Sequence, residues 1–184
     1  EVSWKKTGKD NGMQNIADSI YKNFSAEHPE NSVVQLVRLY KTAATISDVY
    51  WKEQKQNDIK KLLEYCSGLF MEATAASQYA VQGDSLKINV TINNRLGISI
   101  KNADVNMYDI FHGFDALKKN INNNVGLSVF IRPDQKVSQP YWLENKMEKG
   151  SFTITDQQQI GKAENEPLSI LFGVTMEDVY FKFK

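Results

Sequence analysis

The chain has few of the residue types that most often do chemistry or bind metals. Its 184 residues include one cysteine, Cys66, and two histidines, His28 and His112. A lone cysteine cannot form an internal disulfide, and three such side chains are too few for a Cys/His zinc site. Gly8 and Gly12 do not make a phosphate-binding loop, which needs a glycine-rich turn after a strand. These shortages predict no catalytic, metal or cofactor site in this chain.

An excess of charge and long apolar runs are also lacking. The 22 Lys and Arg residues balance the 22 Asp and Glu residues, so no overall field attracts nucleic acid or an anionic membrane. No apolar run approaches the roughly 20 residues that a membrane-spanning helix needs. We therefore expect neither nucleic-acid binding nor membrane insertion. Because the chain begins at Glu1, without a Met or the apolar core of a signal peptide, we expect a processed product or a piece of a longer protein.

What is present is the composition of a folded domain, with 41% hydrophobic and 24% charged residues. Apolar side chains at helical spacing predict helices over residues 13–24, 32–50 and 58–66. Gly68 stands where a left-handed C-terminal cap would lie. The predicted apolar stripe of the first helix consists of Met13, Ile16, Ala17, Ile20, Tyr21 and Phe24.

After Gly68 the apolar spacing changes from the helical period to alternation, which is typical of strands. Residues 109–126 favour a short helix or a loop, since the Asn-rich run at 120–124 competes for backbone hydrogen bonds. We expect an α+β chain with a helical subdomain over residues 1–67 and an antiparallel immunoglobulin-like β-sandwich over residues 68–184. Its Cys-Trp-Cys signature is absent, so only the architecture is predicted. The predicted strands are residues 69–75, 86–92, 97–108, 127–132, 151–155, 168–175 and 179–183.

Three isolated side chains have a functional and a structural interpretation. His28, in Glu27-His28-Pro29-Glu30, could be a metal ligand, but without partner ligands it is better explained by a solvated loop between helices. His112 fits a turn or a packed histidine better than a ligand. Cys66 falls on an apolar helix stripe and is expected to be buried.

Tyr141 and Trp142 are the one candidate binding pair. Exposed aromatic faces stack on sugars, which favours a carbohydrate platform, whereas buried aromatics would fill the sandwich core or an interface. We favour burial, and the exposure of Trp142 distinguishes the two interpretations.

Short motifs spread over nearly the whole chain carry a family resemblance. They are Trp51, Lys55, Cys66-Ser67-Gly68-Leu69, Gly83-Asp84, Asn94-Arg95, Ser138-Gln139-Pro140-Tyr141-Trp142-Leu143, Phe152, Asp156-Gln157, Ile160-Gly161 and Glu164-Asn165. With these motifs the chain resembles the C-terminal, non-catalytic region of large PIG-L (LmbE-like) family deacetylases of Bacteroidetes-type bacteria.

In such proteins an N-terminal Rossmann-like domain is expected to bind zinc through an Ala-His-Pro-Asp-Asp loop and a later His-x-x-His. That domain is expected to remove acetyl groups from N-acetylglucosamine-type sugars. Residues 26–30 only echo the zinc loop, with an inserted Glu, no second Asp and no His-x-x-His after them. The resemblance therefore implies no catalytic or metal residue here, and it implies zinc in a catalytic domain elsewhere in the parent protein.

Two roles follow from the resemblance. In the first, the helices dock the sandwich on the catalytic domain of the parent chain. In the second, the chain is a carbohydrate-binding module that brings the enzyme to a glycan through Tyr141, Trp142 or neighbouring aromatics. The resemblance favours an extracytoplasmic location, periplasmic or at the cell surface, over the cytoplasm.

Overall fold

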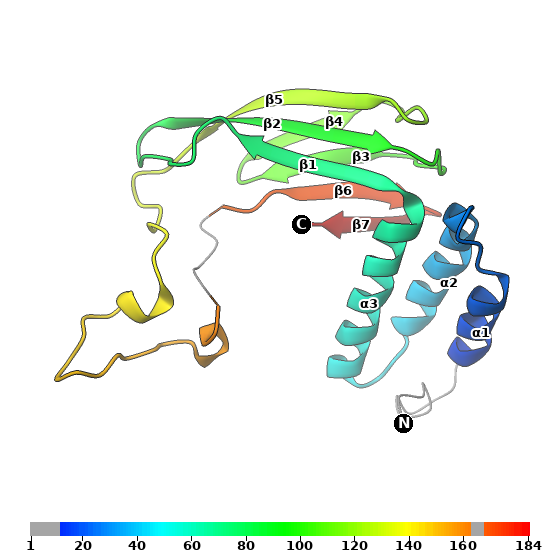
Figure 1. The fold of residues 1–184 in the computed structure, drawn as a ribbon, viewed down its shortest axis with the longest axis horizontal. Helices are drawn as coiled ribbons and strands as arrows, with labels where there is room; N and C mark the ends of the chain where they lie inside the picture. Colours follow the sequence, from blue (N-terminus) through cyan, green and yellow to red (C-terminus); the bar gives the residue numbers. More distant parts are fainter. Residues whose placement is uncertain (1–11, 163–167) are drawn as a thin grey trace.

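The computed structural model describes residues 12–162 and 168–184. Within these residues, helices lead into two antiparallel sheets, and a long connection leaves the sheets before the last two strands (Figure 1). The motif residues Glu164 and Asn165 lie outside the described residues. The helices are α1 (Met13–Asn23), the 3₁₀ helix η2 (Pro29–Ser32), α2 (Val33–Ala43) and α3 (Val49–Ser67).

Local signals explain where these helices begin and end. Helix α1 starts after Gly12, whose φ of 78° is in the left-handed region that glycine adopts easily. Helix α3 starts at Asp48, whose side chain accepts a hydrogen bond from the Trp51 amide at 3.0 Å, and it ends at Gly68 with φ 64°. The predicted C-terminal cap at Gly68 is therefore confirmed.

The predicted helices need two corrections. The second helix was predicted to run to residue 50, but it ends at Ala43. Asp48 then caps a new, 19-residue helix, α3, which begins at Val49 rather than at residue 58. The stripe of α1 is narrower than predicted, since Tyr21 is 85% exposed and Phe24 is 51% exposed. Helix α1 buries Met13 fully, whereas these two aromatics stay exposed.

The strands form two antiparallel sheets. One has the order β1-β2-β5 and the other the order β4-β3-β6-β7, so the fold mixes a short helical N-terminal part with antiparallel sheet. The alternation in β2 is confirmed, because its even-numbered residues from Leu86 to Ile92 are buried. The strands are β1 (Leu69–Ala75), β2 (Ser85–Asn94), β3 (Ala103–Met107), β4 (Ile110–Phe114), β5 (Asn122–Phe130), β6 (Leu171–Met176) and β7 (Val179–Phe183).

The loop or helix predicted over residues 109–126 is wrong, because β4 and the start of β5 lie there. The Asn side chains that favour a loop in isolation find partners across the sheet. Asn93 donates to Asn122 Oδ1 at 2.6 Å, and Thr91 donates to Asn124 Oδ1 at 2.8 Å. Pairing with β2 thus outweighs the local preference of asparagine.

The strand predicted over residues 151–155 is also wrong. Ser151 makes only an isolated bridge with Glu148, around a turn in which Lys149 and Gly150 have φ values of 45° and 81°. A strand requires a neighbour to satisfy its backbone, and no sheet edge runs beside this segment. The segment belongs to the β5–β6 connection, whose residues 131–162 extend away from the sheets in Figure 1.

One cluster of buried apolar side chains joins the helices to both sheets. Tyr40 of α2 packs edge-on against Phe181 of β7 with ring centroids 4.9 Å apart, and Lys41 donates to the Glu177 carbonyl at 2.9 Å. The helices therefore contribute to a core shared with the sheets. Its most buried members include Met13, Leu36, Ile59 and Leu63 from the helices and Val90, Ile92, Val105, Val174 and Phe181 from the sheets.

Candidate functional site

The His28 segment does not assemble a metal site. His28 Nδ1 lies 3.3 Å from Glu30 Oε1, and the His28 side chain is mostly exposed. A backbone hydrogen bond first, and then His28, hold the pKa of Glu30 below its usual range. The positive charge of Lys119 also lowers the pKa of Glu30, and it would repel a metal ion. Among the described residues no three His, Cys, Asp or Glu side chains gather closely enough to hold one, so this segment does not fit zinc.

The other two isolated candidates are packed side chains. His112 lies in β4 and contacts Phe114 edge-on, with ring centroids 5.1 Å apart. Of the two structural interpretations, a turn or a packed histidine, this agrees with the packed one. Cys66 is buried, as predicted, and burial raises the pKa of its thiol.

Tyr141 and Trp142 form the 3₁₀ helix η3 (Tyr141–Leu143) on the β5–β6 connection. Trp142 is 36% exposed and Tyr141 is half-buried, and neither belongs to the core. The interpretation that they fill the sandwich core is therefore wrong. Their rings are 4.9 Å apart at 89°, so they do not form one flat platform, and a flat ligand could stack on only one ring at a time.

The motifs in this connection are brought together locally. The Tyr141 hydroxyl accepts a hydrogen bond from the Gly161 amide at 3.4 Å, and Asp156 caps the 3₁₀ helix η4 (Gln157–Gln159) by accepting from the Gln158 amide at 2.9 Å. Asn145 reaches the Thr153 carbonyl at 2.8 Å. These contacts fold the connection on itself.

The earlier motifs meet where α3 enters the first sheet. Leu69 pairs with Asn94 in the β1–β2 register, and the Arg95 amide donates to the Gly68 carbonyl at 3.3 Å. A Cβ on Gly68 would lie 2.5 Å from Leu96 Cγ, so glycine also allows a close approach here. The residues of this junction are structural, and they connect the helices firmly to the sheet.

The helical layer carries an apolar hollow at its surface, which we call the helical groove. It is a hollow of about 570 Å³ between the three helices. Tyr21 and Leu62, 85% and 47% exposed, stand at its rim, where Lys55 pairs with Asp58 at 3.8 Å. The groove residues are Ala17, Ile20, Tyr21, Phe24, Leu36, Leu39, Lys55, Asp58, Ile59 and Leu62.

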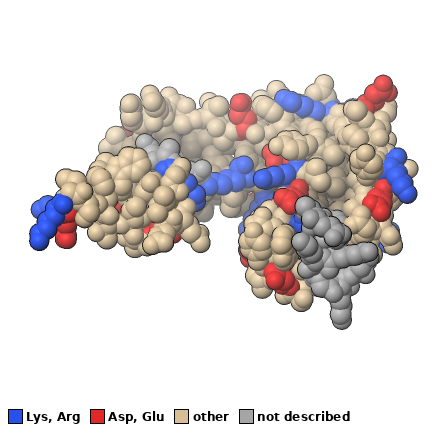
Figure 2. Space-filling model, turned by 60° about the horizontal axis from the view of Figure 1, so that its bottom comes forward, with Lys and Arg blue, Asp and Glu red and all other residues tan. Residues whose placement is uncertain are grey.

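Sequence reasoning named several of these residues as core but did not predict the groove. Tyr21 and Phe24 make the apolar stripe of α1 wider than one neighbouring helix can cover. That width is the sequence feature that could have predicted an open apolar surface. Charges of both signs are interspersed over the underside of the molecule (Figure 2). No helix in residues 12–162 or 168–184 is long and apolar enough to cross a membrane.

Comparison with protein-family models, with curated proteins and with solved structures found no match.

Proposed function

We propose that this chain is the non-catalytic accessory region of a zinc-dependent PIG-L family deacetylase, and that its helices dock it on the catalytic domain of the parent protein. The observation that carries the proposal is the helical groove, an apolar hollow of about 570 Å³ left open by the described residues. Contiguous apolar surface of this kind usually marks a place where another protein surface packs.

The groove has the features of a domain-docking surface. Its floor is apolar, with Leu36 and Ile59 nearly fully buried, and its rim carries large exposed side chains that can reach into a partner. Lys55 and Asp58 supply one charge of each sign at the rim, which would set orientation more than affinity. Catalysis and zinc binding, in this proposal, belong to the partner domain.

We further propose that the sheets have an immunoglobulin-like topology. If the strands are lettered A, B, C, C′, E, F and G in chain order, the two sheets read A-B-E and C′-C-F-G. This order combines the A-B-E and C-F-G groupings of immunoglobulin domains with the extra C′ strand of the variable type. The disulfide of antibody domains has no counterpart, because the lone Cys66 lies in α3.

A second candidate function is binding of a glycan by Tyr141 and Trp142. The exposure of Trp142 on a connection that leaves the sheets favours this role. The perpendicular rings argue for a contact with one sugar residue rather than along a chain of them.

The test is reconstitution of the complex from its parts. The catalytic region of the same parent protein is produced separately, this chain is added, and association is measured by calorimetry alongside acetate release from N-acetylglucosamine oligomers. We expect association that Leu62→Asp weakens by at least about tenfold, since burying an unpaired charge in an apolar interface costs more than 1.4 kcal/mol.

A matched control lies on the same layer. Val34 is 57% exposed on α2 but does not line the groove, so Val34→Asp should leave the affinity within about twofold. Absence of association, or equal weakening by both variants, would refute docking through the groove.

A further inference from the structure

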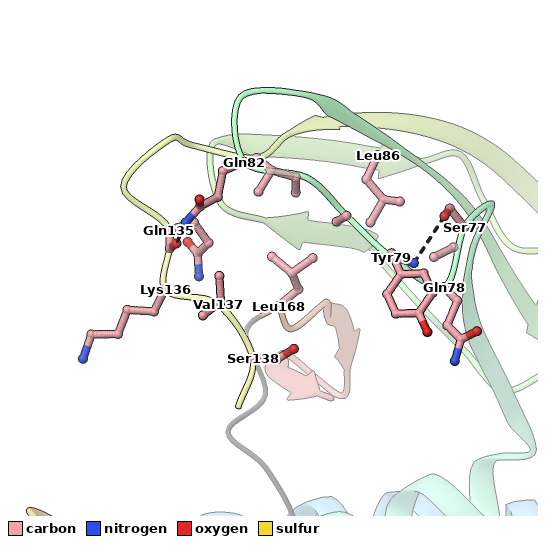
Figure 3. A pocket seen from close by; sticks show the side chains of 13 residues that line it. Ser77, Gln78, Tyr79, Gln82, Leu86, Gln135, Lys136, Val137, Ser138 and Leu168 are labelled. Atoms are coloured by element: carbon pink, nitrogen blue, oxygen red, sulfur yellow. Dashed lines mark hydrogen bonds between the residues drawn. The ribbon is translucent and has the colours of Figure 1, made fainter. Parts of the chain in front are cut away.

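A second hollow, of about 300 Å³, lies at the end of the sheets where β1 turns into β2 (Figure 3). One wall is residues 77–82 of the β1–β2 connection, and the other is residues 135–138, which follow β5. We call this hollow the strand-end pocket. It shares no residue with the helical groove or with the Tyr141 and Trp142 pair.

Backbone hydrogen bonds join the chain segments next to the two walls of the strand-end pocket. The Gly83 amide donates to the Ile131 carbonyl at 2.8 Å, and the Ile131 amide donates to the Asp84 carbonyl at 2.8 Å. The Gln82 side chain adds a bond to the Gln135 carbonyl. Because these bonds already hold the bases of the two walls side by side, binding needs less ordering of the chain, which lowers its entropic cost.

The lining combines an apolar floor with polar groups at the mouth. Leu86 and Ile131 are buried at the floor. Tyr79, 76% exposed, presents its ring beside the Gln78 amide, across the hollow from Ser138 (Figure 3). In the part of the chain that the structure describes, the side chains of Gln78 and Ser138 make no hydrogen bond, so an amide and a hydroxyl are available to a ligand.

Among the described residues that line the strand-end pocket, charge is scarce. Lys136 alone of them is charged, and it is exposed at the mouth. An anion would need several donors or cations, and a cation would need a carboxylate, so neither is well served. The chemistry that matches a ring face, an amide, a hydroxyl and an apolar floor is a neutral polyhydroxylated ring.

We propose that the strand-end pocket binds one residue of a neutral saccharide, with the sugar's C–H face on the Tyr79 ring and its hydroxyls on Gln78 and Ser138. The C–H bonds of a sugar ring carry slight positive charge, which suits the negative face of an aromatic ring. A volume of about 300 Å³ is at the lower end of ligand pockets, as expected for a single ring rather than a large ligand. This inference does not depend on docking through the helical groove.

The test uses the whole chain and a panel of neutral oligosaccharides: cellohexaose, chitohexaose, maltohexaose, mannohexaose and xylohexaose. Binding is followed by amide chemical shifts in ¹H–¹⁵N spectra during titration to about 10 mM sugar, ten times the dissociation constant on the order of 1 mM expected for a small, shallow contact. We expect at least one sugar to shift the amides of residues 77–82 and 135–138.

Three variants test whether binding depends on the Tyr79 ring, on its hydroxyl, or on any exposed tyrosine. Tyr79→Ala should weaken binding by about tenfold, whereas Tyr79→Phe keeps the ring and should stay within about threefold. Tyr65, 75% exposed on α3, is the matched control, and Tyr65→Ala should change nothing. Both positions are exposed, so the three variants should fold, and their spectra check this directly.

Several results would overturn the proposal. They are no shift with any sugar of the panel, undiminished binding in Tyr79→Ala, and shifts centred on residues 141–143 that Trp142→Ala abolishes. Tighter binding of hexagalacturonate than of any neutral sugar, lost in Lys136→Ala, would show that the pocket takes anions instead. Failure of the docking experiment leaves this test unaffected, because the pocket and the groove share no residue.

Discussion

Replacing Asn94 by alanine should be unusually destabilising for the loss of one polar side chain. Asn94 is the last residue of β2 and is only 1% exposed. Its Oδ1 accepts the Gly97 and Ile98 amides at 3.0 Å each, and its Nδ2 donates to the carbonyls of Ile98 at 2.9 Å and Leu117 at 3.4 Å. One side chain thus ties the turn after β2 to the segment before β5.

The magnitude follows from these four bonds. A net contribution of about 0.5–1.5 kcal/mol each would total about 2–6 kcal/mol. The bond to Leu117 is long, and water can reach the exposed Gly97 amide, so we expect a loss of about 3 kcal/mol. For a chain of this length that corresponds to a fall in Tm of about 6–12 °C.

The assay is urea unfolding followed by tryptophan fluorescence, with the denaturation midpoint compared at constant slope. The adjacent Asn93 is the control: it is 6% exposed, makes one side-chain bond, to Asn122, and leaves its own Oδ1 buried without a partner. Asn93→Ala should therefore cost only about 1 kcal/mol or less. If Asn94→Ala lowers the free energy of unfolding no more than Asn93→Ala does, the conclusion that Asn94 holds the turn after β2 to the segment before β5 is refuted.

Other predictions concern the remaining polar and aromatic features. Gly173→Ala places a Cβ 2.0 Å from the Tyr180 hydroxyl, 2.5 Å from its ring carbon Cζ and 2.6 Å from Asp104 Oδ1. It should displace both side chains and break their hydrogen bond, costing at least about 1 kcal/mol in the wild type and less in a Tyr180→Ala background, which removes the ring, as a double-mutant cycle will show. Burial first, and then the hydrogen bond to Asp104, raise the pKa of Tyr180 above its ordinary value; the folded state therefore loses stability as the pH rises above about 10, and Tyr180→Phe should flatten that loss in alkaline unfolding curves. Trp142→Ala should lower stability by less than about 1 kcal/mol, because the ring is outside the core, and a loss of 3 kcal/mol or more in thermal unfolding would contradict this placement. Cys66 should react with a thiol reagent more slowly in the native chain than in urea, since its thiol is buried with a raised pKa; equal rates would show that the end of α3 is open.

The two proposed binding features lie at different parts of the fold. The groove is formed by the helices at one end of the sheets, and the strand-end pocket is formed by loops at the end of β1 and β5. The shared core and the junction at Gly68 connect them. A module of this kind could hold a catalytic domain through one surface and a saccharide through another, and the two experiments test these roles separately.

Much of the fold was readable from the sequence because its signals are local. The end of α3 depends on a glycine that adopts a left-handed backbone at residue 68. The alternation of apolar residues in β2 shows which face of the strand is buried, and this holds whatever sheet the strand joins, because successive side chains point to opposite faces. The burial of Cys66 was predicted from its place on an apolar helix stripe, which is also a local signal.

The tertiary structure alone decided where surfaces are covered and which segments find partners. The predicted stripe of α1 includes Tyr21 and Phe24, but a helix stripe is buried only as far as its neighbours extend, and these two residues stay exposed. Residues 122–124 prefer a loop in isolation and become a strand because β2 supplies cross-strand partners. Residues 151–155 resemble a strand but make only the bridge between Ser151 and Glu148, because the connection carries them away from the sheets. Both binding features belong to this second category, since a groove or a pocket depends on distances between segments that local sequence patterns do not encode.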